Sequence, residues 1–331
     1  CRRSDNRRLF AGPPPGQRVR LDRMRRCRVC RRKPSPRRNC RVTSLSHGRI
    51  DSAVTALPLT LIILTQDEEK NLPECLRSVI GRVDDIHVLD SGSTDGTVAL
   101  AHGFGVPVHV HPFSGFGQQR NWAIDNIPHA HRWVLHLDAD ERMTPDLEAE
   151  LRQLLAADLS EAGFYVPSKL MLDGRWLRHS SGYPVYQVRL FHRDRLRFKD
   201  HGHGQQEVTD GVLGYLKSAY LHEAYGKGLD DWFAKHARYA RREAELVWAD
   251  RSDILTILGR VLGGDRVTRR RALKSLAYRL PFRPTLRLLH LLVINRGLLD
   301  GRAGIVYARM MAAYEAMVGT HLARLRAGVD L

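Results

Sequence analysis

The sequence has 331 residues, 43% of them hydrophobic, which is enough for one large or two ordinary domains with a substantial core. Its formal net charge of +17 does not describe the whole chain, because residues 1–57 hold 17 Lys and Arg against 3 Asp and Glu. The remaining residues hold 36 Lys and Arg against 33 Asp and Glu, so their charges nearly balance. A uniformly basic protein is therefore excluded, and the basic charge belongs to the first 57 residues.

Residues 1–57 are rich in Arg, Pro and Ser and lack hydrophobic periodicity, so we expect a disordered tail. Nucleic-acid binding through its arginines stays open, although no interleaved aromatic residues support it. A zinc site is a weaker alternative, because the second Cys-x-x-Cys half is missing from Cys27, Cys30, Cys40 and His47. There is no apolar signal-peptide segment, which favours an upstream extension and a start at Met24 or near Val54. Only Cys75 lies beyond the tail, as in a reducing compartment.

From Leu59 onward, strand and helix patterns alternate along the chain. Apolar runs of strand length occur at 59–64, 86–89, 106–110 and 133–137. Helical patterns follow them, with starts at Asn71, at Thr94 or Asp95, at Gln118 and at Thr144–Pro145. This alternation predicts an open α/β sheet, in which ligands bind at the carboxyl ends of the strands.

The most informative stretch is Trp133–Arg142, where a short apolar strand ends in three carboxylates within four residues. These are Asp138, Asp140 and Glu141, and their mutual repulsion calls for a positive partner. A divalent cation is the economical one, since Mg²⁺ takes oxygen ligands and leaves positions for substrate phosphates. An Asp-x-Asp at a strand end therefore indicates a site for a metal-bound nucleoside diphosphate. The alternative is an acidic turn that caps the helix starting near Pro145.

Several blocks of the sequence resemble the signatures of GT-A fold, family 2 inverting glycosyltransferases. They are Leu-Thr-Gln-Asp-Glu-Glu-Lys-Asn-Leu at 64–72, Val-Leu-Asp-Ser-Gly-Ser-Thr-Asp-Gly-Thr at 88–97, Gly-Phe-Gly-Gln-Gln-Arg-Asn-Trp-Ala at 115–123 and Leu-Asp-Ala-Asp-Glu at 137–141. The branch that is most similar is the lipopolysaccharide-core β-glucosyltransferase type, with further similarity at 187–191, at His222 and at 299–304. The resemblance implies a Rossmann-like, mostly parallel open sheet flanked by helices, with a C-terminal helical extension.

The resemblance also implies which residues bind the donor, a UDP-sugar. Thr65 and Asp67 would border the uracil, Asp90 would bind the base or ribose, and Asp138 would contact the ribose. Asp140 would bind the Mg²⁺ or Mn²⁺ that bridges the two phosphates. The second carboxylate that the family carries after Asp90 is a serine here.

Each of the other candidate site residues also has an explanation that involves no ligand. Arg120 and Asn121 would position the diphosphate or sugar, unless they lie on a solvated helix face. Arg189, on an alternating strand at 185–191, would hold an anionic acceptor group, unless it is a surface arginine. His222 would complete the metal shell, although a lone histidine is more often a packed or capping residue.

An inverting transfer needs a general base on the acceptor hydroxyl. In the resembling family a His-x-x-Glu or His-Glu element lies near segment 200–207, which makes Glu207 our choice, ahead of Asp200 and Glu141. We also expect Gly202 and Gly204 to let this segment move over a bound donor.

Beyond Asp230 the pattern is helical, basic at 266–287 and apolar at 286–294, too short to span a bilayer. Such helices suit the surface of an anionic membrane, or else form a subdomain packed on the catalytic domain. We therefore expect a tail at 1–57, a catalytic domain at 58–228 and a helical, membrane-associating region at 229–331.

These observations predict a metal-dependent enzyme that transfers a hexose from a nucleotide sugar to a glycolipid or polysaccharide such as lipopolysaccharide core. It would lie on the inner face of the cytoplasmic membrane. One alternative is a sugar-phosphate nucleotidyltransferase, but segment 65–70 lacks the glycines of a phosphate loop. Another is a non-catalytic protein that binds nucleic acid or membrane through its tail.

Overall fold

The computed structural model describes residues 55–201, 204–249, 254–263, 268–269, 272–273, 276 and 282–328. The chain divides into two units, Cys1–Ser52 and Ala53–Leu331, and all described residues belong to the second. The expectations for the tail, namely disorder, the zinc alternative and the start of the chain, lie outside the described residues. So does half of the basic stretch at 266–287.

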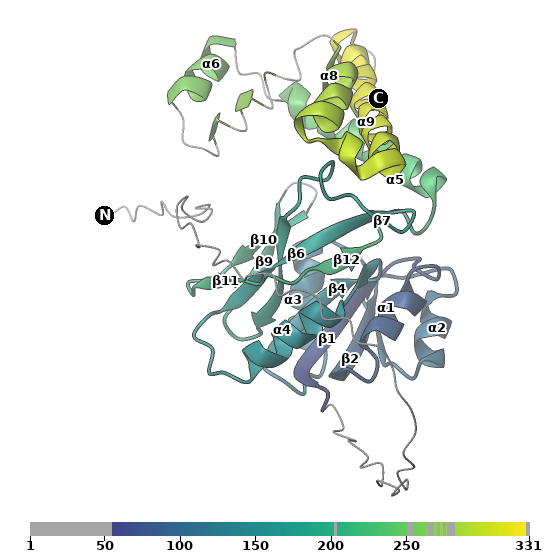
Figure 1. Ribbon diagram of the computed structural model, residues 1–331, viewed down its shortest axis with the longest axis vertical. Helices are drawn as coiled ribbons and strands as arrows, with labels where there is room; N and C mark the ends of the chain where they lie inside the picture. Colours follow the sequence, from purple (N-terminus) through teal and green to yellow (C-terminus); the bar gives the residue numbers. More distant parts are fainter. Residues whose placement is uncertain are drawn as a thin grey trace, which may run out of the picture. The chain divides into compact units, whose positions relative to one another are not determined.

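The first half of the main sheet is parallel, as the sequence predicts (Figure 1). Strand β1 (Leu57–Thr65) lies between β2 (Val83–Asp90) and β4 (Trp133–Asp138), and β3 (Val108–Val110) flanks β2. Strand β1 is mostly apolar because both of its faces are covered, and Leu61, Ile62 and Ile63 are all fully buried. The carboxyl ends of these strands meet at one edge.

The second half of the sheet is mixed. Strand β8 (Val185–His192) runs antiparallel between β4 and β6 (Gly163–Leu172). Two short strands complete the path, because β12 (Tyr220–His222) pairs with both β6 and β5 (Glu141–Arg142). Strands β7 (Arg175–Trp176) and β11 (Leu213–Tyr215) also pair with β6, whereas β9 (Arg197–His201) and β10 (Gly204–Val208) form a separate hairpin.

Three helices connect the strands of the first half: α1 (Leu72–Val79), α2 (Thr97–Gly103) and α3 (Phe116–Asn126). A fourth, α4 (Pro145–Leu155), connects β5 to β6. Helix α4 begins as predicted, with the Thr144 hydroxyl accepting a hydrogen bond from the Leu147 N–H at 3.1 Å. Helix α1 has Asn71 as its N-cap residue, as predicted, but the side chain makes no capping hydrogen bond to the helix. The Asn71 amide instead donates to the Glu68 carboxylate at 2.8 Å. Helix α3 begins two residues before the predicted Gln118.

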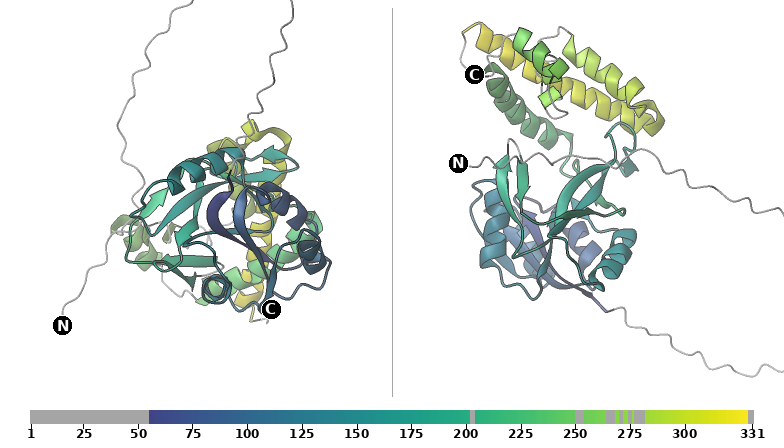
Figure 2. Two further views of the ribbon diagram at one scale, coloured as in Figure 1. Left: turned by 90° about the horizontal axis from the view of Figure 1, so that it is seen from below. Right: turned by 90° about the vertical axis from the view of Figure 1, so that its left-hand side faces the viewer.

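The C-terminal helices confirm the predicted extension. They are α5 (Leu229–Ala249), α6 (Ile254–Gly263), α8 (Arg283–Leu289), the π-helical η1 (His290–Ile294), the 3₁₀-helical η2 (Gly297–Asp300) and α9 (Gly301–Arg326). Helices α5 and α9 lie side by side, with Ala240 and Ala244 packed against Val318 and Leu322 (Figure 2). Asp300 joins η2 to the loop after β7 by accepting hydrogen bonds from the His179 and Ser180 N–H groups. None of the helices described combines the length and the apolar character that crossing a membrane requires.

Candidate active site

The acidic turn between β4 and β5 is held by the backbone around it. The Asp138 N–H donates to the Glu141 carboxylate at 3.0 Å, and the Ala139 N–H donates to the Leu64 carbonyl at 3.1 Å. The turn is thereby fixed at the carboxyl end of β1. Glu141 is fully buried at the start of β5, whereas the Asp138 side chain remains 41% exposed.

Two buried arginines neutralise this turn. The Arg189 guanidinium lies 2.7 Å from Asp138 Oδ2 and also pairs with Glu141, while Arg120 lies 2.8 Å from Asp138 Oδ1. Burial alone would raise the pKa of Asp138, but the two arginines outweigh that effect and lower it. Burial raises the pKa of Glu141 to about 7, against the opposing influence of Arg189. The positive partner expected for the acidic cluster is thus supplied in part by the chain itself.

This arrangement changes what the two arginines can do. Their side chains are only 1% and 3% exposed, so neither the solvated helix face for Arg120 nor the surface position for Arg189 is correct. Both guanidinium groups contact Asp138 and so position its carboxylate. The donor contact suggested for Arg120 and the acceptor contact suggested for Arg189 stay predictions.

Asp140 and His222 form the second pair of the site. Strand β12 places His222 opposite Glu141, and His222 Nε2 lies 3.4 Å from Asp140 Oδ2. Burial would raise the pKa of Asp140, but the hydrogen bond and charge of His222 lower it. Burial would lower the pKa of His222, and Asp140 instead raises it to about 9. A carboxylate and an imidazole thus face each other with 24% and 30% of their side chains exposed.

This pair fits part of a metal shell. In the portion of the chain that is described, no three His, Cys, Asp or Glu side chains gather closely enough to hold an ion alone. Two protein ligands are nevertheless what a Mg²⁺ or Mn²⁺ site needs when phosphate oxygens and water fill the other positions. Asp140 and His222 are partly exposed and so can meet such a ligand.

The loops that follow β1 and β2 are tied to each other at the same sheet edge. Asp90 is 1% exposed and accepts hydrogen bonds from the Thr65 hydroxyl at 2.8 Å and from the Gly92 and Ser93 N–H groups at 2.9 and 2.8 Å. Asp67 is exposed, has a φ of 55°, and accepts from the Thr94 N–H at 2.7 Å. Asp90 and Thr65 therefore shape this edge from within, whereas Asp67 lies at its surface.

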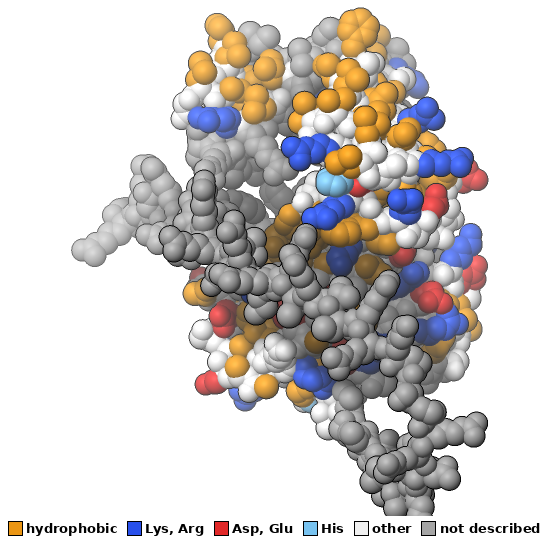
Figure 3. Space-filling model, viewed as in Figure 1, with side chains coloured by type: hydrophobic (Ala, Val, Ile, Leu, Met, Phe, Trp, Pro, Cys, Tyr) orange, Lys and Arg blue, Asp and Glu red, His pale blue; other side chains and the backbone are white. Residues whose placement is uncertain are grey.

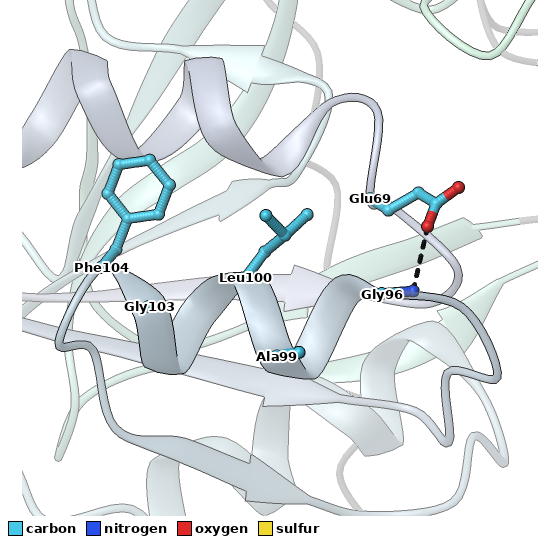
Figure 4. Close-up of a pocket in the computed structure, with 6 residues that line it drawn as sticks. All are labelled: Glu69, Gly96, Ala99, Leu100, Gly103 and Phe104. Atoms are coloured by element: carbon cyan, nitrogen blue, oxygen red, sulfur yellow. Dashed lines mark hydrogen bonds between the residues drawn. The ribbon is translucent and has the colours of Figure 1, made fainter.

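A neighbouring contact extends this loop pair toward α2. The Glu69 carboxylate accepts from the Gly96 N–H at 3.0 Å beside a cavity of about 610 Å³ that Leu100 and Phe104 also line (Figure 4). This cavity lies beside helix α2, and its lining is mostly apolar. It contains none of the predicted site residues.

No sequence pattern indicates Lys227, whose side chain contacts the loop that follows β1. Its ammonium group lies 2.6 Å from the Glu68 carboxylate and donates to the Gln66 carbonyl at 3.2 Å. A single lysine after a three-residue strand forms no motif. Glu68 lies in the block at 64–72 that resembles the family signature, but the resemblance assigns no role to its side chain.

The remaining predicted residues lie along the β9–β10 hairpin. Asn121 uses both ends of its amide on Phe198, donating to the carbonyl at 2.8 Å and accepting from the N–H at 2.9 Å. It therefore fastens α3 to β9. Glu207 on β10 accepts a hydrogen bond from the Tyr165 hydroxyl, and Asp200 on β9 accepts from the Gly117 N–H at 2.8 Å. Gly202, one of the two expected hinge glycines, lies outside the described residues.

Comparison with known proteins adds to this geometry. The family model described as Glycosyl transferase family 2 matches residues 60–208. The chain is 27% identical over 298 residues to the lipopolysaccharide core biosynthesis glycosyltransferase LpsC of Rhizobium meliloti (strain 1021), covering 84% of this chain and 98% of that protein. It is 31% identical over 117 residues to an uncharacterized glycosyltransferase of Rickettsia felis, covering 35% of this chain and 41% of that one.

Solved structures are also similar to the chain. Glucosyl-3-phosphoglycerate synthase from Mycobacterium tuberculosis, in complex with Mn²⁺ and uridine-diphosphate-glucose, is 17% identical with a TM-score of 0.35, covering 50% of this chain and 70% of that one. Residues 1–349 of TarS from S. aureus are 14% identical with a TM-score of 0.32, covering 81% of this chain and 91% of that one.

Proposed function

We propose that the chain transfers a hexose from a UDP-sugar to a glycolipid or polysaccharide acceptor with inversion, because the model of glycosyl transferase family 2 matches residues 60–208 and LpsC is similar over most of the chain. The observation that carries the proposal is the acidic turn at the carboxyl ends of β1 and β4, where Asp138 is fixed and Asp140 faces His222. Lipopolysaccharide core is the acceptor class we favour, since the similarity to LpsC extends over 98% of that protein. The match to this family favours the proposal over the nucleotidyltransferase and non-catalytic alternatives.

In this proposal the donor lies along the edge formed by the loops after β1 and β2. Asp67 borders the uracil, and Thr65 and Asp90 keep the loop in shape. Asp138, held by its two arginines, accepts a hydrogen bond from the ribose. Asp140 and His222 would hold Mg²⁺ or Mn²⁺, and the bound ion would neutralise the charge that grows on the leaving diphosphate.

The proposed base is Glu207. The Tyr165 hydroxyl donates to one of its carboxylate oxygens and so fixes the orientation of the side chain. The acceptor hydroxyl gives its proton to Glu207 as its oxygen attacks the anomeric carbon from the side opposite the diphosphate. A positioned carboxylate of this kind typically contributes about 10²–10⁴ in rate. We therefore expect Glu207→Gln to retain UDP binding and to lose transfer, whereas Asp200→Asn and Glu141→Gln test the two weaker candidates in parallel.

The donor assignment is tested by isothermal titration of the full chain with UDP, with and without Mn²⁺. The wild type should bind UDP with a strong dependence on the ion, and Asp140→Ala should lose that dependence. Asp146→Ala removes an exposed carboxylate six residues away and serves as the matched control. Full Mn²⁺-dependent binding in the Asp140 variant would show that the central assignment is wrong.

Peripheral contact with an anionic membrane is a further part of the proposal. Segment 282–299 contains no Asp or Glu, and it exposes Phe282 (78%), Ile294 (70%) and Leu299 (67%). Hydrophobic side chains gather over the C-terminal helices with basic side chains beside them (Figure 3). A surface that is apolar and basic fits the boundary between acidic head groups and acyl chains.

Co-sedimentation with vesicles tests the membrane contact. We expect the full chain to bind vesicles containing phosphatidylglycerol, and Ile294→Asp to bind less. Val212→Asp is the control, because Val212 is 71% exposed and lies in the turn before β11. Equal binding by the two variants would locate any membrane contact elsewhere.

A further inference from the structure

A second hollow lies apart from the acidic turn, where three elements far apart in sequence come together. Its volume is about 390 Å³, and its lining includes Phe113, Ser114, Phe116, Asp200, Tyr239 and Arg242. The first three precede or begin α3, Asp200 belongs to β9, and the last two lie on α5. None of the donor roles proposed above uses this hollow.

Two aromatic rings border the hollow and remain open to solvent. Phe113 and Phe116 meet edge to face with ring centroids 5.0 Å apart, and they are 44% and 41% exposed. Aromatic side chains are usually buried, so a solvent-exposed pair beside a polar hollow indicates a binding surface. The C–H face of a sugar ring packs well on such aromatic surfaces while its hydroxyls stay free for hydrogen bonds.

The polar groups of the hollow complement those rings. Asp200 is exposed, and its Oδ1 accepts the Gly117 N–H at 2.8 Å, which fixes a carboxylate that can accept from sugar hydroxyls. Arg242 is exposed and forms no ion pair with an acidic side chain anywhere in the described part of the chain. Its neighbour Arg241, by contrast, pairs with Glu245 at 3.1 Å. An uncommitted guanidinium at the rim of a pocket suits a carboxylate or phosphate, which it can bind through two parallel hydrogen bonds.

The hollow is connected to the donor site through α3 and the hairpin. Gly117 contacts Asp200 at one end, and Arg120 lies three residues further along the helix, a rise of about 4.5 Å. Arg120 pairs with Asp138 at 2.8 Å and donates to Gln205 at 2.7 Å. Gln205 in turn stands opposite Asp200 in the β9–β10 register. Asp200, which lines the hollow, therefore contacts α3 about one helical turn before Arg120.

We propose that this hollow is an acceptor subsite that binds a sugar unit carrying a carboxylate or phosphate, with the sugar face on Phe113 and Phe116 and the anionic group on Arg242. This inference rests on the proposed function, because it assigns the hollow to the acceptor of that reaction. Glu207, the proposed base, lies on the same hairpin, three residues beyond Gly204 at the edge of the hollow. The subsite would present the acceptor to the donor edge.

The experiment is saturation-transfer NMR on the full chain, with glucuronate as the anionic probe and glucose as the neutral one. The wild type should bind glucuronate more tightly than glucose. Phe116→Ala should weaken glucuronate binding about tenfold, and Phe116→Tyr, which keeps the ring, should not. Arg242→Gln should abolish the preference for glucuronate, whereas Arg238→Gln, on the same helix but outside the lining of the hollow, should leave it intact.

Binding of UDP with Mn²⁺ is measured in the same samples and should be unchanged in all four variants. If glucuronate binding does not differ between Phe116→Ala and Phe116→Tyr, or between Arg242→Gln and Arg238→Gln, the subsite is refuted while the donor assignment stands. If the wild type binds glucuronate as described but does not bind UDP, the proposed function is refuted. The hollow would then bind saccharides as part of a different activity.

Discussion

Replacing Arg189 with methionine tests whether the acidic turn depends on its buried cation. The guanidinium is 1% exposed and lies between Asp138 and Glu141, so its removal leaves two carboxylates with a single remaining arginine, Arg120, on Asp138. Removing one partner of a buried ion pair typically costs about 3–5 kcal/mol. A domain is stable by about 5–15 kcal/mol, so this loss is a large share of the total. At roughly 2–4 °C for each kcal/mol, the midpoint of thermal unfolding should fall by roughly 6–20 °C.

The assay is urea unfolding of the full chain at neutral pH, with Arg193→Met as the control. Arg193 is a partly exposed arginine whose contact with Asp194 spans 3.6 Å, so its removal should change the free energy of unfolding by less than about 1 kcal/mol. Adding Glu141→Gln to Arg189→Met should restore part of the loss, because it removes a buried carboxyl group that has lost its partner and can stay buried only by binding a proton or by remaining charged and unpaired. The reasoning is refuted if the Arg189 and Arg193 variants are equally stable, or if the second substitution makes the first one worse.

Three further predictions concern the fold around the site. Gly117→Ala should lower the free energy of unfolding by about 1–3 kcal/mol, because the new Cβ would lie 2.7 Å from the β9 backbone, whereas Gly103→Ala, with open space around its Cβ, should be neutral or stabilising in the same urea titration. Glu150→Gln should cost about 1 kcal/mol near pH 7, because its carboxylate accepts two backbone N–H groups before β12. Burial alone would raise the pKa of Glu150, but these hydrogen bonds lower it, so the difference from wild type should vanish as unfolding is followed to acidic pH. A chain that begins at Val54 should melt cooperatively and bind UDP as the full chain does, and loss of either would make the tail part of the fold.

The parallel half of the sheet could be predicted from the sequence because its signals are local. Strands β1 and β4 are buried on both faces and therefore appear as continuous apolar runs, and Thr144–Pro145 combines a capping hydroxyl with a residue suited to the first helical turn. Each of these signals needs only a few neighbouring residues. The acidic residues come directly after these parallel strands, which indicates that they meet at the carboxyl edge of the sheet.

The pairing of Arg120 and Arg189 with the acidic turn could not be predicted in the same way. Arg189 lies on an alternating strand, which predicts one solvent-facing side, but the end of β8 is buried on both faces, because the adjacent residues Leu190 and Phe191 pack in two different core clusters. Arg120 gave no sign of burial, because its partners Asp138 and Gln205 are 18 and 85 residues away. Long-range contacts of this kind depend on how strands are ordered, which hydrophobic periodicity does not encode.

The pairing of β5 with β12 has a consequence for dividing this protein. The family match ends at residue 208, yet His222 reaches Asp140 only through β12, and Lys227 fastens the first loop from still further along the chain. A fragment cut at 208 would leave β5 as an unpaired edge beside Asp140. Any chimera that exchanges the helical extension for another, or any split-enzyme reporter built on this scaffold, therefore has to place its junction after Lys227, where the chain enters α5.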